Sequence, residues 1–371
     1  MKVTIPKERL LHALHKLQNV LPSDLIVSLT SNVHIRTDNT KVHLTVTDLH
    51  MTIEATIPAT VHEEGALLLP AKHLFALCKE ISAQELTLTG NPPGLLLLRS
   101  GASQFRLLTS LADGFPLIQL SQSTTLFSCT STALKEMFMK TVFAVSRDEK
   151  RASFMNLCLQ KEGCTITVTG TDGKRLARVI INTSSTEPWE GILLIPLKIA
   201  QEIAQFLDNG QDTVTVALDN DRLILFTEGF VMQSSLFMGG YPDVNKIIPE
   251  RTSHPIYLHR EELISLLKQI SLFTTQRAPS VRFSFLPGEL QLSTTTADKG
   301  EGNVTMPVNF QGDAIHIRLN PHFFLDILRH IKTETVHMEL KDSFTPGLIL
   351  VEPTQDAAAA LFVLMPMRSD I

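Results

Sequence analysis

The stretch with the clearest potential for phosphate chemistry is the hexapeptide Gly-Thr-Asp-Gly-Lys-Arg at residues 170–175. A P-loop separates its two glycines by four residues and then requires a lysine followed by serine or threonine. Here only two residues separate the glycines, and Arg175 follows the lysine. The spacing therefore excludes the backbone cradle that a P-loop builds around a nucleotide phosphate.

No other group of residues has the spacing of a catalytic or metal-binding site. Of the 13 histidines, only His12 and His15 share a predicted helix face, and no further ligand type follows at a typical zinc spacing. The four cysteines form no C-x-x-C pair, which indicates reduced thiols in a cytoplasmic protein. The sequence also lacks a G-x-S-x-G nucleophile elbow and an H-E-x-x-H motif. We therefore expect no active site, no metal ion and no cofactor.

Three acidic residues recur at nearly constant spacing, in Thr47-Asp48, Thr171-Asp172 and Ala297-Asp298. The intervals between them are 124 and 126 residues. Carboxylates can act as general acids and bases. A turn-forming aspartate, whose carboxylate accepts hydrogen bonds from nearby backbone N–H groups, explains these three better. Their regular interval points to an internal repeat.

Two further markers have nearly the same period. The first is the leucine that opens an amphipathic helix pattern, with intervals of 124 and 129 residues between Leu10, Leu134 and Leu263. The second is the start of another helix directly after a strand, with intervals of 126 and 124 residues between Pro70, Pro196 and Asn320. Proline is favoured at a helix start because the N–H group that it lacks would be unpaired there. Three independent markers predict three repeats in the 371 residues.

Each predicted repeat contains strand-like segments around its two helices. Segments such as 42–46, 165–168 and 214–218 alternate with period two, are rich in β-branched residues and are separated by Gly, Asn and Asp turns. The expected helices are residues 7–18, 71–81, 131–145, 196–207, 260–272 and 320–332. Two helices packed on antiparallel sheet make an α+β domain. We predict three such domains, at residues 1–122, 123–250 and 251–371.

Composition narrows the class of protein. The chain is 43% hydrophobic and 19% charged, with a formal net charge of −5. This hydrophobic content supports sizeable cores and excludes a disordered chain. Apolar runs are far shorter than the roughly 20 residues that cross a bilayer, and the N-terminus lacks the apolar segment of a signal peptide. The net negative charge argues against tight binding of nucleic acid on a single surface.

A triplicated domain without catalytic residues suggests an architectural role. Repeated units can arc and close into a ring by head-to-tail association, and the edges of their sheets are then paired across subunits. The segment 104–108 is a candidate edge strand in the first repeat, and Leu272-Phe273 is a candidate partner surface in the third. Taken alone, either segment is also compatible with ordinary core packing.

Three motifs resemble one known family in the right order and spacing. They are Thr171–Ala177, Tyr241–Val244 followed by Ile247–Pro249, and Val363–Arg368. On these residues the chain resembles the bacterial sliding clamp, the beta subunit of DNA polymerase III, over essentially all of its length. The resemblance implies a head-to-tail homodimer whose six domains form a ring around duplex DNA, with twelve helices lining the hole and a continuous sheet outside. It also implies a processivity factor that tethers the polymerase to its template without catalysis.

The resemblance further implies a pocket between the second and third domains for short linear motifs of partner proteins. These partners are the replicative polymerase, the clamp loader and repair polymerases. The matching positions are Phe154, Thr171, Gly173, Lys174, Arg175, Leu176, Pro242, Lys246, Ile247, Asn320, Phe323, Phe344, Pro346, Val363, Leu364, Met365, Pro366, Met367 and Arg368. Apolar walls with adaptable methionines would accept leucine or phenylalanine anchors, while a few polar groups would fix the peptide backbone.

Two further sets of residues follow from the resemblance. The family's DNA-facing positions correspond to Lys72, Lys79, Lys150, Arg151 and Lys198. Its apolar dimer contact corresponds to Phe105 and Leu107 on one protomer and to Leu272 and Phe273 on the other. In the six predicted helices Lys and Arg outnumber Asp and Glu by five, so the rest of the chain carries a formal charge of −10. A mildly positive hole in an acidic exterior would attract duplex DNA to the inside and would let it slide.

The sequence departs from the family pattern at several positions. Lys174 stands where many relatives have histidine, which predicts a changed peptide preference. The first-domain loop 19–27 carries Pro-Ser-Asp at 22–24 in place of an arginine, and Ala102 and Gln104 replace basic residues near the dimer edge. These changes predict weaker DNA contact and a weaker dimer. Two other classes stay open on the residues alone: a peptide-binding scaffold ring that does not engage DNA, and an enzyme of unknown type.

Overall fold

The computed structural model describes residues 1–21, 29–90, 93–120, 122–184, 187–252, 255–353 and 358–367. The loop residues 22–24 and the predicted site residue Arg368 lie outside this described part. The chain divides into two compact units. Unit 1 consists of Met1–Leu134, Ser184–Trp189 and Gln205–Leu236, and unit 2 consists of Lys135–Thr183, Glu190–Ala204 and Phe237–Ile371.

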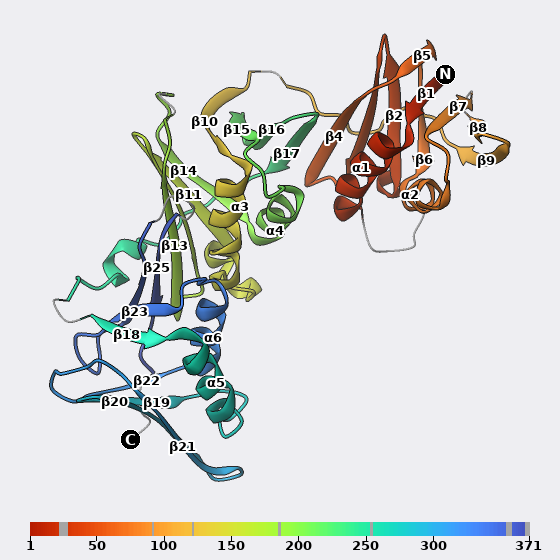
Figure 1. The fold of residues 1–371 in the computed structure, drawn as a ribbon. Helices are drawn as coiled ribbons and strands as arrows, with labels where there is room; N and C mark the ends of the chain where they lie inside the picture. Colours follow the sequence, from red (N-terminus) through yellow and green to blue (C-terminus); the bar gives the residue numbers. More distant parts are fainter. Residues whose placement is uncertain are drawn as a thin grey trace. The chain divides into compact units, whose positions relative to one another are not determined.

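Unit 1 contains two β-sheets (Figure 1). The strand order of the five-stranded sheet is β5 (Thr60–Glu63), β1 (Lys2–Pro6), β7 (Glu85–Gly90), β8 (Gly94–Ser100) and β9 (Ser103–Thr109). The order of the eight-stranded sheet is β10 (Thr124–Thr130), β15 (Thr213–Asp219), β16 (Arg222–Thr227), β17 (Phe230–Ser235), β4 (Met51–Pro58), β3 (Lys41–Thr47), β2 (Asn32–Asp38) and β6 (Gly65–Pro70). Antiparallel pairing of β17 with β4 joins the second predicted repeat to the first.

Unit 2 also contains two sheets. The order of its eight-stranded sheet is β14 (Gly191–Pro196), β11 (Asn156–Glu162), β12 (Thr165–Thr171), β13 (Arg175–Asn182), β25 (Ala359–Leu364), β24 (Gly347–Val351), β23 (Thr335–Glu339) and β18 (Ile256–His259). The order of its four-stranded sheet is β21 (Gly300–Pro307), β20 (Glu289–Thr296), β19 (Val281–Leu286) and β22 (Ile315–Leu319). Antiparallel pairing of β13 with β25 joins the second predicted repeat to the third.

The two eight-stranded sheets have the same connectivity. In unit 1 the strands β6, β2, β3 and β4 follow one another across the sheet, as β14, β11, β12 and β13 do in unit 2. The remaining halves, β17-β16-β15-β10 and β25-β24-β23-β18, also correspond in order. In both sheets the last strand of one repeat, β17 or β25, pairs with the fourth strand of the preceding repeat, β4 or β13, so the strand order agrees with the predicted repeats.

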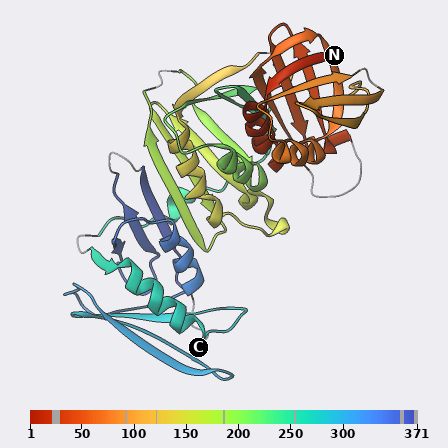
Figure 2. The same cartoon turned by 45° about the vertical axis from the view of Figure 1, so that its right-hand side comes forward.

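All six predicted helices form. They are α1 (Lys7–Leu17), α2 (Ala71–Glu80), α3 (Ser131–Met139), α4 (Leu197–Phe206), α5 (Arg260–Ser271) and α6 (Pro321–Arg329). In unit 1 α1 packs against α2, and in unit 2 α5 packs against α6 (Figure 2). The amphipathic spacing works as expected, because Leu10, Leu14 and Leu17 of α1 are buried. Short 3₁₀ helices occur at η1 (Gln18–Val20), η2 (Leu29–Ser31), η3 (Val142–Ala144), η4 (Glu149–Met155) and η5 (Val244–Ile247).

Two helices end more than one residue earlier than the sequence predicts. Helix α3 stops at Met139 rather than at residue 145, because the Thr141 hydroxyl donates to the carbonyl of Met137 at 2.7 Å and the chain then turns into η3. Helix α6 stops at Arg329 rather than at residue 332, and the His330 ring lies 2.7 Å from the Asp326 carbonyl oxygen at this end. The hydrophobic period continues past both ends, but local hydrogen bonds satisfy the last carbonyl groups.

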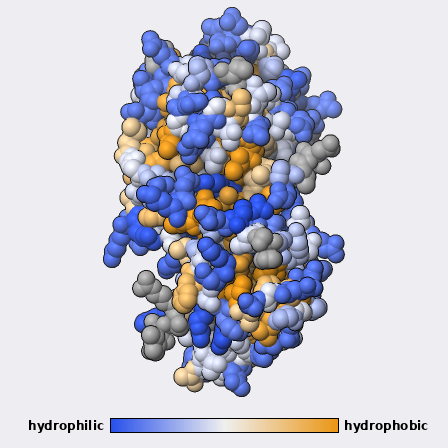
Figure 3. All heavy atoms as spheres, turned by 90° about the vertical axis from the view of Figure 1, so that its left-hand side faces the viewer, coloured by the Kyte–Doolittle hydropathy of each residue, from blue (hydrophilic) through white to orange (hydrophobic). Residues whose placement is uncertain are grey.

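Apolar side chains fill the space inside each unit. Phe127 in unit 1 and Phe283, Phe324 and Phe362 in unit 2 are almost completely buried, and each such side chain contributes about 2 kcal/mol to stability. On the face shown in Figure 3, hydrophobic residues form small patches separated by hydrophilic ones. Among the described residues, no helix is both long and apolar enough to span a membrane.

Candidate functional site

The turn between β12 and β13, residues 171–175, is held together by its own side chains. The Thr171 hydroxyl donates to the Arg175 carbonyl at 2.6 Å and accepts from the Gly173 N–H at 3.0 Å. The Asp172 carboxylate accepts from the N–H groups of Lys174 and Arg175 at 2.8 and 3.0 Å. Gly173 has a φ of 80°, a conformation that favours glycine. We call residues 171–175 the recognition turn.

The first repeat contains the same turn at residues 47–51. The Thr47 hydroxyl bonds the Met51 carbonyl and the Leu49 N–H, and the Asp48 carboxylate accepts from the N–H groups of His50 and Met51. Leu49 has a φ of 74° at the position equivalent to Gly173. The interpretation of these aspartates as turn formers is therefore confirmed for Asp48 and Asp172. The hydrogen-bonded frame belongs to the fold, and only the side chains of residues 173–175 distinguish the second copy.

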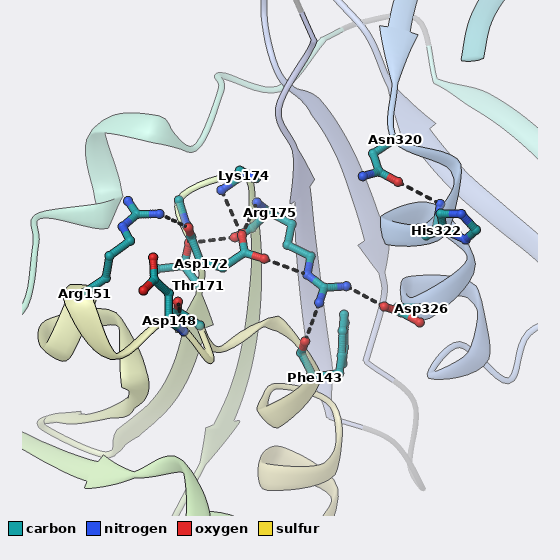
Figure 4. A network of polar contacts seen from close by, with 12 residues as sticks. Phe143, Asp148, Arg151, Thr171, Asp172, Lys174, Arg175, Asn320, His322 and Asp326 are labelled. Carbon is teal, nitrogen blue, oxygen red and sulfur yellow. Dashed lines mark hydrogen bonds and ion pairs between the residues drawn. The ribbon is translucent and has the colours of Figure 1, made fainter. Parts of the chain in front are cut away.

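The Arg175 side chain connects the recognition turn to helix α6 (Figure 4). Its Nε donates to Asp172 at 3.2 Å, its Nη1 to Asp326 at 2.7 Å and its Nη2 to the Phe143 carbonyl at 2.7 Å. The guanidinium carbon lies 4.5 Å from the centre of the Phe323 ring and 5.3 Å from that of Phe143. With only 11% of the side chain exposed, Arg175 acts as a clasp between segments that are 151 residues apart in the sequence.

A cavity of about 540 Å³ borders this clasp, and we call it the charged cavity. Its lining residues are Phe143, Val145, Ser146, Arg147, Asp148, Arg151, Asp172, Lys174, Arg175, Phe323 and Asp326. The structure thus brings together Lys174, Arg175 and Phe323 from the predicted peptide site. No group of three or more potential metal ligands occurs among the residues described.

Arg151 lies in the wall of the charged cavity, although the sequence placed it among the DNA-facing residues. Its Nη1 donates to the Asp172 carbonyl at 2.6 Å, and its guanidinium carbon lies 4.4 Å from the centre of the Phe154 ring. A Cβ atom added to Gly173 would lie 2.8 Å from Arg151 Nη2. In the structure the charged group of Arg151 is directed to the recognition turn and to a residue of the predicted peptide site, and its contact with DNA stays a prediction.

An apolar cluster adjoins the recognition turn. Its buried members are Leu176, Val244, Leu348 and Val363, and its partly buried members are Tyr241, Ile247, Ile248, Leu350, Leu361 and Met365. The Met365 N–H donates to the Lys174 carbonyl at 3.0 Å, and the Met367 N–H donates to the Arg318 carbonyl at 2.8 Å. These two backbone hydrogen bonds hold residues 365–367 next to the recognition turn and to strand β22.

The remaining predicted peptide-site residues lie around these two features. Thr171 and Leu364 are buried, while Pro242, Pro346, Pro366 and Met367 are half-buried. Asn320 is the N-cap of α6 and accepts from the His322 N–H at 3.0 Å, so its side chain has a structural task. Lys246 is exposed and pairs with Asp243 at 3.3 Å.

Phe344 is exposed on a turn that an aspartate organises. The Asp342 carboxylate accepts from the N–H groups of Phe344 and Thr345 at 2.8 and 2.6 Å. These hydrogen bonds lower the pKa of Asp342 below its ordinary value of 3.8. The turn thus presents a large aromatic side chain to solvent, in the region that the sequence assigns to peptide binding.

Sequence reasoning missed part of the lining of the charged cavity, namely Phe143, Val145, Ser146, Arg147, Asp148 and Asp326. Asp326 follows Phe323 by three residues on α6 and shares its helix face, so the helical period could have identified it. The others belong to an irregular segment after α3, which has no periodic pattern.

The predicted DNA-facing lysines are exposed. Lys72 and Lys79 are seven residues apart on α2, which places them on one face of the helix two turns apart. Lys150 lies in η4 and Lys198 near the start of α4, and both are exposed. Exposure and spacing agree with an electrostatic role, and their contact with DNA stays a prediction.

The two predicted halves of the dimer contact lie at sheet edges of different repeats. Strand β9 is the last strand of its sheet, with Phe105 half-buried. Leu107 is only 7% exposed and points into unit 1, whereas the neighbouring Leu108 is 75% exposed. Leu272 is exposed at the end of α5, and Phe273 packs against Gly302 of the edge strand β21. Among the described residues, β9 pairs along its length only with β8, and the part that Leu107 plays in a dimer contact stays a prediction.

Comparison with known proteins covers the chain from end to end. Three family profiles of the DNA polymerase III beta subunit match it, the N-terminal domain at residues 1–119, the central domain at 129–243 and the C-terminal domain at 245–368. The chain belongs to the DNA polymerase III beta subunit family. The beta sliding clamp of Chlamydia muridarum is 37% identical over 368 residues, and that of Escherichia coli is 27% identical over 379 residues. These matches cover 99% of this chain and 99% and 100% of the two relatives.

Solved structures of sliding clamps share the fold. A DNA polymerase sliding clamp from Pseudomonas aeruginosa with ligand has a TM-score of 0.91 and 25% identity, covering 99% of this chain and 100% of that one. A second structure from that organism, bound to griselimycin, has a TM-score of 0.90 at 25% identity and covers 99% of each chain. The chain thus carries three clamp domains and is a DNA sliding clamp, a processivity factor without catalytic activity. This finding excludes the enzyme and the scaffold that does not engage DNA.

Proposed function

We propose that the chain tethers its partners at the recognition turn while a head-to-tail homodimer encircles duplex DNA in the cytoplasm. Its three domains would be residues 1–122, 123–250 and 251–371. The observation that carries the proposal is the junction at residues 174–176. There Lys174 and Arg175 line the charged cavity, while Leu176 belongs to the apolar cluster. An extended peptide could place a leucine or phenylalanine on the cluster while its polar groups face the cavity.

Peptide binding can be measured by fluorescence anisotropy. The probe is a fluorescein-labelled octapeptide with a Leu-Phe pair, and the competitor is griselimycin, which is bound to the Pseudomonas aeruginosa clamp. We expect binding by the native chain, displacement by griselimycin, and at least a tenfold loss in Met365→Asp, because the new carboxylate would enter the apolar cluster. Met238→Asp, at an exposed position outside the site, is the matched control and should bind normally. Equal loss in both variants would contradict the assignment.

Topological binding to DNA can be tested separately with a nicked circular plasmid. After loading by the cognate clamp loader, the protein should elute with the circle in gel filtration and should be released when a restriction enzyme linearises the plasmid. Binding in a groove would survive linearisation. The double variant Lys72→Glu/Lys79→Glu should shorten the residence on the circle, since it reverses two exposed charges on one face of α2.

The dimer contact is proposed at the edge strand β9 and the end of α5. Phe105, Leu108, Leu272 and Phe273 offer half-buried or exposed apolar side chains there. Sedimentation velocity of native chain and of Leu272→Glu over a range of concentrations measures the association. We expect the variant to dissociate at concentrations at which the native chain stays dimeric. Unchanged sedimentation of the variant would place the interface elsewhere.

A further inference from the structure

Two carboxylates in the wall of the charged cavity are already paired with arginine side chains. Four basic and three acidic side chains line it. Asp172 receives the Arg175 guanidinium as well as two backbone N–H groups. Asp326 is shared between Arg175 at 2.7 Å and Arg329 at 3.0 Å. These two carboxylates are therefore neutralised inside the protein, together with Arg175.

The remaining basic groups of the cavity lack such partners. Within the described part of the chain, no carboxylate lies within 4.0 Å of the charged groups of Arg147, Arg151 or Lys174. The one acidic side chain left on the wall is Asp148, which accepts from the Lys150 N–H at 3.1 Å. The charged side chains that line the cavity sum to +1, and this positive charge lies on Arg147, Arg151 and Lys174, where a ligand can neutralise it.

Lys174 lies next to the place where an apolar anchor would bind. Its carbonyl accepts from the Met365 N–H, which extends the pairing of β13 with β25 by one residue. Two residues of extended chain span at most about 7 Å. Lys174, which lines the charged cavity together with Arg175, therefore lies within about 7 Å along the backbone of Leu176 in the apolar cluster.

The first repeat shows that the fold does not require this charge. Its turn has the same hydrogen bonds and the same backbone contact to the following repeat, from the Ser235 N–H to the His50 carbonyl at 3.0 Å. The positions of Lys174 and Arg175 are occupied there by His50 and Met51. A lysine at position 174 is thus an addition to the second copy, beyond what the turn needs to form.

We propose that Lys174, supported by Arg147 and Arg151, selects partner peptides that carry a carboxylate about two residues from their apolar anchor. This inference rests on the proposed peptide-binding function and assigns its specificity. A peptide is favoured over a nucleic acid as the anionic ligand, because the cations adjoin an apolar cluster and phosphodiester backbones offer no apolar anchor.

The test compares three labelled octapeptides with capped ends. All three carry the Leu-Phe pair, and they differ only in having Asp, Asn or Lys two residues before the leucine. With the native chain we expect the Asp peptide to bind about fivefold more tightly than the Asn peptide in 50 mM salt. Fivefold corresponds to about 1 kcal/mol, the upper range for a partly exposed ion pair. In 500 mM salt the preference should shrink to less than twofold, because screening shortens the range of the attraction.

Charge variants identify the residue responsible. Lys174→Ala should bind the Asp and Asn peptides equally, and Lys174→Glu should prefer the Lys peptide. Lys332→Glu makes the same charge change at an exposed position outside the cavity and should retain the native preference. The inference is overturned if the native chain does not discriminate, or if Lys332→Glu alters the preference as much as Lys174→Glu does.

Three outcomes separate this inference from neighbouring ones. If a 20-base-pair duplex displaces the Asp peptide from the native chain, the cations bind phosphate and the inference is wrong. If none of the three peptides binds, the proposed peptide-binding function itself fails. If the Asn peptide binds as tightly as the Asp peptide, that function stands and only the assigned specificity is lost.

Discussion

Removal of the clasp formed by Arg175 is expected to have the largest effect on stability. Replacing it by methionine, the residue at the equivalent position 51, keeps an unbranched apolar stem and removes three charge-assisted hydrogen bonds. Hydrogen bonds to charged groups contribute about 1.5–3 kcal/mol each. The loss is smaller than the sum of the three hydrogen bonds, because the Asp172 and Asp326 side chains are 17% and 32% exposed and are hydrated again when the arginine is removed. We expect Arg175→Met to lower the free energy of local opening by about 3 kcal/mol.

Native-state hydrogen exchange measured by mass spectrometry can follow this change, because it reports local opening in a chain with several domains. A loss of about 3 kcal/mol corresponds to exchange that is faster by about two orders of magnitude. We expect the effect in α6 and in residues 141–146, which the clasp joins. Exchange in α1 and α2 should not change.

The control is Arg329→Met, which removes the second arginine from the same aspartate. Arg329 is 60% exposed, so its ion pair should contribute at most about 0.5 kcal/mol. A double-mutant cycle of Arg175→Met with Asp326→Asn should give a coupling energy of about 1.5 kcal/mol. If exchange in α6 rises less than threefold in Arg175→Met, or rises equally in Arg329→Met, the interpretation of Arg175 as a clasp is wrong.

Three further predictions concern single positions. Leu49→Gly should raise the free energy of unfolding by about 0.5 kcal/mol in urea denaturation. The φ of 74° strains a leucine, and because the side chain is exposed, its removal loses little packing. A decrease in the free energy of unfolding would contradict this account. Gly302→Val should displace Phe273, since a Cβ at this position lies 3.1 Å from its ring, and should weaken the dimer in sedimentation at least tenfold. Burial lowers the pKa of His330 below its ordinary value of 6.5, so as pH falls below 6.5 the unfolded chain binds a proton first and stability decreases. In His330→Gln the urea midpoint should no longer decrease in this way as the pH falls below 6.5. An unchanged pH dependence would refute the assignment to His330.

The sequence was sufficient for the repeat and for the turns because both depend on local information. The aspartate turns are closed by bonds within five residues, so Thr and Asp at the right positions predict them. The six helices follow from the period of buried leucines, as Leu10, Leu14 and Leu17 illustrate. Their ends were less predictable, since Thr141 stops α3 through a side-chain bond that hydrophobic spacing does not report.

The cavity depended on contacts between distant segments and was only partly predictable. Arg175 and Asp326 are 151 residues apart, and nothing in either neighbourhood identifies the other. Arg151 looked like a surface cation because its acceptor is a backbone carbonyl, that of Asp172, which leaves no trace in the residue types. The resemblance to the clamp family located the recognition turn, but it did not indicate which of its charges are already neutralised.

The self-closing turn also has a consequence for how such a protein can be altered. Thr171 and the Asp172 carboxylate fix the backbone, so the side chain of residue 174 takes no part in holding it. Ligand preference can therefore change by substitution there at little cost to folding, either during evolution or by design. Since Thr47 and Asp48 build an identical frame, the segment 49–51 is a ready position for grafting Gly-Lys-Arg, and the first repeat becomes a scaffold on which a second docking loop can be engineered.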